Sequence, residues 1–288
     1  MPFDARSRLL AQSPVVSLRP PFEAAHILIT VKAYPAVGRK TGECVCVAGV
    51  RIDGDHVRWA RLFPVGFRDL PVERQFAKYQ VVALRVKRPS TDRRPESLTP
   101  DLDSLALGPI VGTDNGTWRT RAELLAPLIG ATTTCELAAR AAIEGQAAPS
   151  LGLIEPTDVS ELLVSDNPDF DSDEGRHADV DLFGRVKSPL KSAPFIAKYH
   201  YHCAGPACPG HEQTLIDWES GVLARKNLHK GLDEAKRLHR ERFLTEMCGP
   251  GRATHFFVGN QHQHPQSFLV LGVWSPRRGS GQQATLDL

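Results

Sequence analysis

Apolar and polar residues follow a strand-like pattern through the first part of the chain. Apolar and β-branched residues fill the segments 26–34, 43–52, 56–65 and 79–87, which short loops separate. The sequence Asp53-Gly54-Asp55 between the second and third segments is typical of a hairpin turn. Four strands joined by short connections predict a small antiparallel β-barrel or sandwich.

Helical spacing follows these strands. The segments 120–130 and 132–145 are amphipathic and end at glycines, and threonines before the second are candidate N-caps. We therefore predict a basic, β-rich domain with two helices over residues 25–160. The Pro-containing segment 1–24 has no clear period, so we expect it to be a flexible arm.

A second α+β domain is predicted over residues 186–276. Segment 195–203 has the pattern of a strand, and segment 211–228 that of a strand followed by a helix or of one continuous helix. A strongly amphipathic helix is expected at 232–247. Two further strands are expected at 255–260 and 267–276. The sequence shows no internal repeat, and the predicted class is α+β, with a Cys/His loop in the C-terminal region.

Charge is unevenly distributed along the 288 residues, although the net charge is only +2. Between residues 32 and 94 there are fourteen basic and six acidic residues, whereas residues 155–181 contain ten acids and one arginine. We expect residues 161–185 to form an acidic linker or loop and residues 277–288 a disordered tail.

The composition argues against a membrane protein. It is 41% hydrophobic and 24% charged, as in ordinary globular proteins, and no apolar run approaches the roughly 20 residues that span a bilayer. The N-terminus lacks the apolar core of a secretory signal. We expect a cytoplasmic protein of bacterial type, whose six cysteines are thiols or metal ligands rather than disulfides.

The strongest chemical signal is the motif Cys203-x4-Cys208-x2-His211, which lies in a loop rich in glycine and proline. Thiolates and imidazole are typical zinc ligands, so the motif predicts a structural zinc site. A closed site needs a fourth ligand, and Cys248, at the end of the long predicted helix, is the first candidate. The alternative is that these residues are ordinary core or capping groups.

Four histidines are other candidates for the fourth ligand. His200 and His202 alternate with Cys203 along the predicted strand, so they point to the opposite face, which counts against them. His262 and His264 are more remote possibilities.

Asp217 and Glu219 allow two interpretations. On a strand they would share a face, and two carboxylates could hold Mg²⁺ or Mn²⁺ in a nuclease site. On a helix they would diverge, and acidic residues at a helix start favour the helix dipole. Acidic helix starts are common, so we favour the second interpretation.

Basic and aromatic residues are interleaved in the third and fourth predicted strands. Guanidinium groups pair with phosphates and aromatic rings stack on bases, so this pattern is typical of nucleic-acid binding. OB-type barrels bind oligonucleotides in this way. The candidate residues are Arg58, Trp59, Arg61, Arg68, Lys87 and Arg88.

The leading hypothesis is therefore a zinc-stabilised, nucleic-acid-associated protein. One alternative is a metal-dependent phosphodiesterase or nuclease that uses Asp217 and Glu219, and another is a protein-interaction module with a protein partner. The phosphate-binding patterns GxGxxG and GxxxxGK[ST] are absent from the sequence. The sequence leaves open whether the protein is an enzyme.

Overall fold

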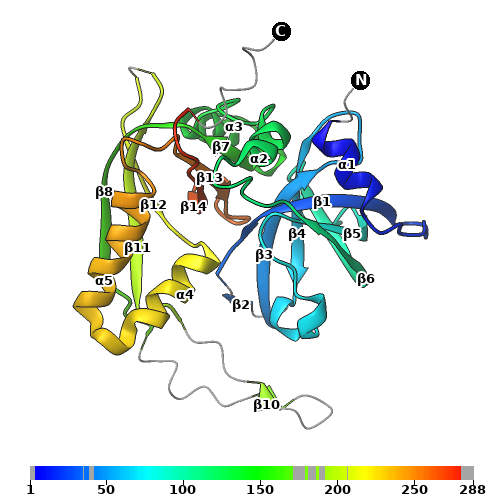
Figure 1. Cartoon of the computed structure of the whole chain (residues 1–288), viewed down its shortest axis with the longest axis horizontal. Coiled ribbons are helices and arrows are strands. Elements are labelled where there is room, and N and C mark those ends of the chain that lie inside the picture. The colour runs from blue at the N-terminus through cyan, green and yellow to red at the C-terminus, as the bar shows by residue number, and fades with distance from the viewer. Residues whose placement is uncertain are drawn as a thin grey trace.

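Two small β-barrels lie side by side, with helices around them (Figure 1). The structure is a computed structural model that describes residues 4–34, 36–38, 42–170, 179–180, 186–187, 192–205 and 207–279. It confirms the predicted α+β class and the N-terminal barrel. In the described part of the chain, no helix is both long and apolar enough to cross a membrane.

The N-terminal barrel contains five main strands in the order β1-β5-β6-β4-β3, and the pairing of β3 with β1 closes it. Only β4 and β6 run parallel among these neighbours. This Greek-key order is that of an OB-type barrel. The strands are β1 (Glu23–Lys32), β3 (Gly42–Arg51), β4 (Arg58–Val65), β5 (Gln80–Lys87) and β6 (Ser97–Ile110), with the short β2 (Ala36–Gly38) on the edge of β3.

The pattern of apolar residues in the sequence does not predict β6. Its side chains are mostly only half-buried, so the strand lacks the regular alternation of apolar residues that marks the others. It also contains Pro100, which pairs with Val86 although proline is unusual inside a sheet.

The C-terminal region forms a second barrel. Its first strand is bent: β7 and β8 are separated only by Glu155, and they pair with β13 and β11, respectively. A parallel bridge between Leu215 and Val270 closes the barrel next to β12 and β14. The strands are β7 (Leu151–Ile154), β8 (Pro156–Asp166), β11 (Phe195–Cys203), β12 (His211–Thr214), β13 (His255–Asn260) and β14 (Phe268–Trp274); β9 (Asp179–Val180) and β10 (Val186–Lys187) form a separate pair.

Both barrels therefore use the same strand order, in which the third and fifth strands are parallel neighbours. They differ in the connection between the third and fourth strands. The first barrel has two 3₁₀ turns there, Phe67–Asp69 and Val72–Arg74. The second has helices α4 (Trp218–Asn227) and α5 (Leu232–Arg240), and α5 continues as a π-helical segment over Glu241–Glu246. The duplication lies in the topology and is not visible as a sequence repeat.

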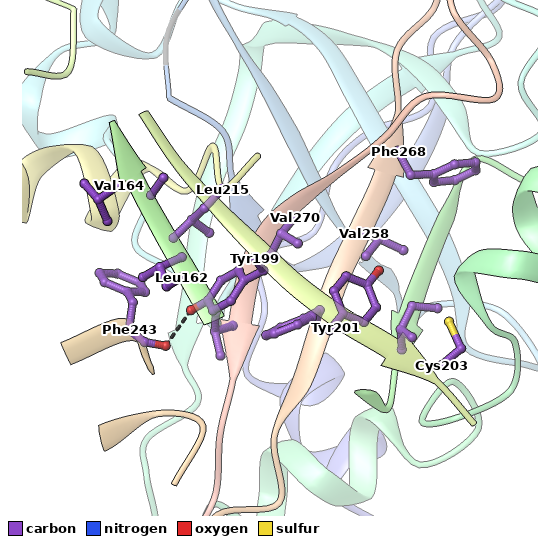
Figure 2. Packing of buried hydrophobic residues seen from close by; sticks show 14 of the residues in the cluster. Leu162, Val164, Tyr199, Tyr201, Cys203, Leu215, Phe243, Val258, Phe268 and Val270 are labelled. Atoms are coloured by element: carbon purple, nitrogen blue, oxygen red, sulfur yellow. Dashed lines mark hydrogen bonds between the residues drawn. The ribbon is translucent and has the colours of Figure 1, made fainter. Parts of the chain in front are cut away.

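Three clusters of buried apolar residues fill the two barrels and the space between them. One fills the N-terminal barrel with residues such as Ile27, Val47 and Leu84. A second fills the C-terminal barrel around Tyr199 and Tyr201, as Figure 2 shows. The third lies between the barrels, and its members come from the outer faces of both. Strands that contribute to two clusters are buried on both faces, which explains the long apolar runs in the sequence.

Three helices flank the barrels. They are α1 (Ala5–Ala11), α2 (Arg119–Leu125) and α3 (Thr134–Glu144). The predicted flexible arm instead contains α1, because Ala5 and Leu9 are buried in the cluster between the barrels and Asp4 caps the helix. Residues 161–166 of the predicted linker belong to β8. Most of the remaining linker and residues 280–288 of the predicted tail lie outside the described residues.

We expect the buried side chain of His239 to make the unfolding free energy depend on pH. It is only 1% exposed, its ring stacks on Phe243, and burial together with Arg240 lowers its pKa from 6.5 to about 4. Below pH 6.5, His239 binds a proton in the unfolded chain but stays neutral in the folded protein until the pH approaches 4. About 3 kcal/mol of unfolding free energy is thus lost as the pH falls from 6.5 to 4. Urea unfolding at several pH values should show a shallower dependence for His239→Phe; an unchanged dependence would contradict this assignment.

Candidate metal centre and basic groove

Four potential metal ligands converge at one end of the second barrel. The side-chain ligand atoms of Cys135, Cys203, Cys208 and His211 all lie within 4.8 Å of one another. Each of the three sulfurs lies 3.3 Å from Nε2 of His211. In a tetrahedral zinc site, sulfur and nitrogen ligands at ordinary bond lengths are about 3.5 Å apart. The group is therefore compatible with a bound metal ion.

Different elements supply these ligands. Cys203 ends β11, His211 begins β12, and Cys208 lies in the hairpin loop between them. Gly205 and Gly210 have positive φ angles of 121° and 88°, which glycine adopts readily, and they let the loop turn back on itself. The loop brings Sγ of Cys208 to 3.2 Å from the backbone N–H of Cys203, which donates to it.

The fourth member of the group, Cys135, comes from the first turn of α3. A capping box between Thr133 and Glu136 starts this helix. The hydroxyl groups of Thr134 and Tyr201 are hydrogen-bonded at 2.6 Å, which fixes the start of α3 against the barrel. Cys135 is thereby held beside His211, although 76 positions separate them in the sequence.

The thiols differ in their proton affinity. Burial would raise the pKa of Cys208, but the backbone N–H groups of Cys203 and Gly210 outweigh this effect and lower it. Burial and the neighbouring sulfurs raise the pKa of Cys135 to about 12. Three crowded sulfurs that repel each other's negative charge are a set of donors that a divalent cation would stabilise.

Cys248, the predicted fourth ligand, is not part of this group. Its thiol lies 3.4 Å from the carbonyl oxygen of Phe243, and burial raises its pKa to about 12. Cys135 is the fourth member of the ligand group instead. The sequence contains a signal for the start of α3, but nothing in it brings that helix next to the Cys203 loop.

The histidine alternatives also lie elsewhere. His200 and His202 point away from the barrel core, as their alternation with the buried Tyr201 and Cys203 predicts. His200 contacts Glu212 at 2.9 Å. None of the four histidine alternatives is in the ligand group, as far as the described residues extend.

Asp217 and Glu219 lie at the start of α4, where it meets the first barrel. Asp217 is the N-cap, and its Oδ1 accepts a hydrogen bond from the backbone N–H of Glu219. Its Oδ2 lies 2.7 Å from Nζ of Lys78, and the Glu219 carboxylate lies 3.3 Å from the same nitrogen. Burial alone would lower the pKa of Lys78, but the two carboxylates raise it above its ordinary value. The two carboxylates thus lie at a helix start, as the second interpretation predicts, and both contact Nζ of Lys78, where the nuclease alternative would need Mg²⁺ or Mn²⁺.

A groove with a volume of about 810 Å³ opens at one end of the N-terminal barrel. At this end β3 and β5 finish while β4 and β6 begin. Four of the six predicted nucleic-acid-binding residues line it: Arg58, Trp59, Lys87 and Arg88.

The other two predicted residues lie elsewhere. Arg61 is only 3% exposed and donates to the carbonyl and hydroxyl oxygens of Ser150 at 3.0 and 3.1 Å. The carboxylate of Glu96 accepts hydrogen bonds from the backbone N–H and hydroxyl of the same serine. Arg61 thus joins the two barrels. Arg68 lies on the turn after β4, at the opposite end of that strand from the groove.

The fold and site define a protein of two OB-type barrels with a Cys₃His group in the second. The chain belongs to the family described as Domain of unknown function (DUF8757), whose model matches residues 130–287. A second model, Domain of unknown function (DUF8758), matches residues 23–127. The boundary between the two matched regions falls near residue 128, between the barrels. The linker predicted from the sequence lay later in the chain, at 161–185.

The comparison with curated proteins gave no match. One similar solved structure is described as "Structure of murine DNA binding protein bound with ds DNA". It is 6% identical, with a TM-score of 0.29, and the alignment covers 88% of this chain and 96% of that one. A TM-score this low supports no inference about function.

Proposed function

We propose that this protein binds nucleic acid through the groove of its N-terminal barrel and that a structural zinc ion stabilises its C-terminal barrel. The observation that carries the proposal is the convergence of Arg58, Lys87 and Arg88 with Trp59 in one groove. OB-type barrels are suited to binding oligonucleotides, which is a parallel at the level of the fold.

The charge of the groove supports this proposal. Arg58, Lys87 and Arg88 are exposed, and none of them forms an ion pair with a carboxylate of the described residues. The two glutamates of the groove have partners: Glu23 pairs with Arg51, and Glu96 binds Ser150. Positive charge is therefore available for phosphate groups.

The aromatic rings of the groove offer stacking surfaces. Trp59 is partly exposed, and its ring contacts that of Phe257 in the second barrel edge to face, with ring centroids 6.2 Å apart. Nζ of Lys87 lies 4.9 Å from the ring centroid of Phe22. A partly exposed ring anchored from behind is suited to stack on an unpaired base.

The role proposed for zinc is structural. Four protein ligands would fill a tetrahedral coordination sphere, which leaves no position for substrate or water. Thiolate and imidazole donors favour zinc over magnesium or calcium. A site with three thiols is suited to a reducing compartment, so we place the protein in the cytoplasm.

Binding to single-stranded DNA and RNA oligonucleotides tests the groove. We expect the triple variant Arg58→Ala/Lys87→Ala/Arg88→Ala to bind roughly 10- to 100-fold more weakly at about 0.1 M salt, because three phosphate contacts are lost. The slope of log K against log salt should become shallower by about 2. Fluorescence anisotropy across a salt series measures both quantities.

A matched control removes the same charge elsewhere. The variant Arg119→Ala/Lys226→Ala/Lys230→Ala changes three exposed basic residues that do not line the groove. It should retain most of the affinity and the salt slope. Equal losses in the two triple variants, or no binding by the wild type at low salt, would refute the proposal.

A further inference from the structure

A second cavity, with a volume of about 550 Å³, opens at the end of the C-terminal barrel. It lies where β8 and β13 begin and β14 ends, and residues of the segment after β14 line part of it. No described residue lines both this cavity and the basic groove. Its volume is within the range of pockets that hold small ligands.

The outer part of the cavity is positively charged. Three arginines line it, Arg252, Arg277 and Arg278, together with one carboxylate, that of Glu155. The guanidinium groups of Arg252 and Arg278 donate to backbone carbonyls. Nε of Arg252 donates to the carbonyl oxygen of Glu246, and Nε of Arg278 donates to the carbonyl oxygen of Arg252. Carbonyl acceptors orient these side chains without neutralising them, so the cavity has a net attraction for anions.

Two of the lining residues, Trp274 and His255, carry buried rings. Trp274 is 2% exposed, and its Nε1–H has no hydrogen-bond partner within the described part of the chain. His255 is 5% exposed, and its ring centroid lies 5.0 Å from that of Trp274. A buried indole N–H without a partner is costly unless something else accepts its hydrogen.

The histidine supplies the complementary group. Nδ1 of His255 lies 3.0 Å from the carbonyl oxygen of Ala253, which can only accept, so Nδ1 carries the proton. Burial lowers the pKa of His255, which favours the neutral ring and leaves Nε2 as an acceptor. A donor and an acceptor thus lie on neighbouring rings, and both rings belong to residues that line the same cavity as the three arginines.

We propose that this cavity binds a nucleoside monophosphate group, with the phosphate near the arginines and the base near Trp274 and His255. The group comes either from a free nucleotide or from the phosphorylated end of a nucleic acid. The site is separate from the basic groove and does not depend on the function proposed for that groove.

Titration calorimetry of the full chain with AMP, GMP, CMP and UMP tests the proposal. At least one of them should bind, and more tightly than its nucleoside or inorganic phosphate alone. Trp274→Phe keeps an aromatic side chain, although a smaller one, and removes the N–H, and should weaken binding about fivefold or more. Arg278→Gln should weaken it about tenfold. The groove variant Arg58→Ala/Lys87→Ala/Arg88→Ala is the control and should bind the nucleotide normally.

Competition distinguishes the two sources. An oligonucleotide with a 5′-phosphate that displaces the bound nucleotide, while its 5′-hydroxyl counterpart does not, identifies a nucleic-acid end as the ligand. Failure of the phosphorylated oligonucleotide to compete identifies the free nucleotide. No binding of any of the four probes at about 1 mM, or unchanged binding in both folded variants, would overturn the proposal.

Discussion

Cys135→Ser is expected to abolish the binding of about one zinc ion per chain, whereas Cys248→Ser is expected to retain it. Sγ of Cys135 lies 3.3 Å from His211, within the group of four ligands. Serine is a poor zinc ligand, so the variant loses one of four donors. Cys248 is a matched control because it is also a partly buried free thiol of the second barrel, but it lies outside the group.

The loss of metal should also destabilise the second barrel. Zinc would join α3 to the hairpin between β11 and β12, and binding free energy at a structural site contributes directly to folding. We expect the unfolding free energy of Cys135→Ser to fall by several kcal/mol, and chelation of the wild type to have a similar effect.

Elemental analysis of protein purified without a metal-affinity tag measures the first effect, and thermal unfolding with and without a chelator measures the second. Zinc retained in Cys135→Ser would show that Cys135 is not a ligand. A wild-type protein without metal would remove the proposed centre altogether.

The second large effect is expected at the joint between the barrels. Lys78→Met should lower the unfolding free energy by about 3–5 kcal/mol, because it leaves the Asp217 carboxylate buried without its cation. Asp217 is 2% exposed, and its Oδ2 lies 2.7 Å from Nζ of Lys78. Burial raises the pKa of Asp217. Protonation of the carboxylate in the variant will therefore reduce the loss of unfolding free energy.

The double variant Lys78→Met/Asp217→Asn separates charge from helix capping. Asparagine is as good an N-cap as aspartate but carries no charge, so the double variant should recover much of the stability lost by Lys78→Met. Lys198→Met is the exposed control. Lys198 pairs with Glu212 at the surface, where loss of the pair should cost less than about 1 kcal/mol.

Urea unfolding of the four proteins measures these differences. If Lys78→Met costs no more than Lys198→Met, the buried pair does not stabilise the joint. If the double variant is no more stable than Lys78→Met, the unpaired charge is not the cause of the loss.

The sequence was sufficient to predict most of the local structure. Alternating apolar residues identified β1, β3, β4 and β5, and the threonines before Cys135 identified the start of α3. These signals are local, because hydrophobic periodicity and capping depend on residues a few positions apart. The main barrel strands it missed were β6, whose pattern is irregular, and β7 and β8, which form one bent strand next to the acidic segment.

Local spacing also identified part of each candidate site. Cys203, Cys208 and His211 lie within nine positions of one another, and all three belong to the ligand group. Arg58 and Trp59 were found because basic and aromatic residues are interleaved on one strand. Residues this close are already neighbours once the strand or loop forms.

Only the tertiary structure decided which distant residues complete these sites. Cys135 replaces Cys248 in the ligand group because α3 docks beside the hairpin, and Arg61 binds Ser150 of the other barrel instead of facing the groove. Asp217 meets Lys78 across the joint between the barrels. The composition of a strand or helix fixes which of its faces is apolar. The partner of that face is chosen by the packing of the whole chain, and no local pattern encodes it.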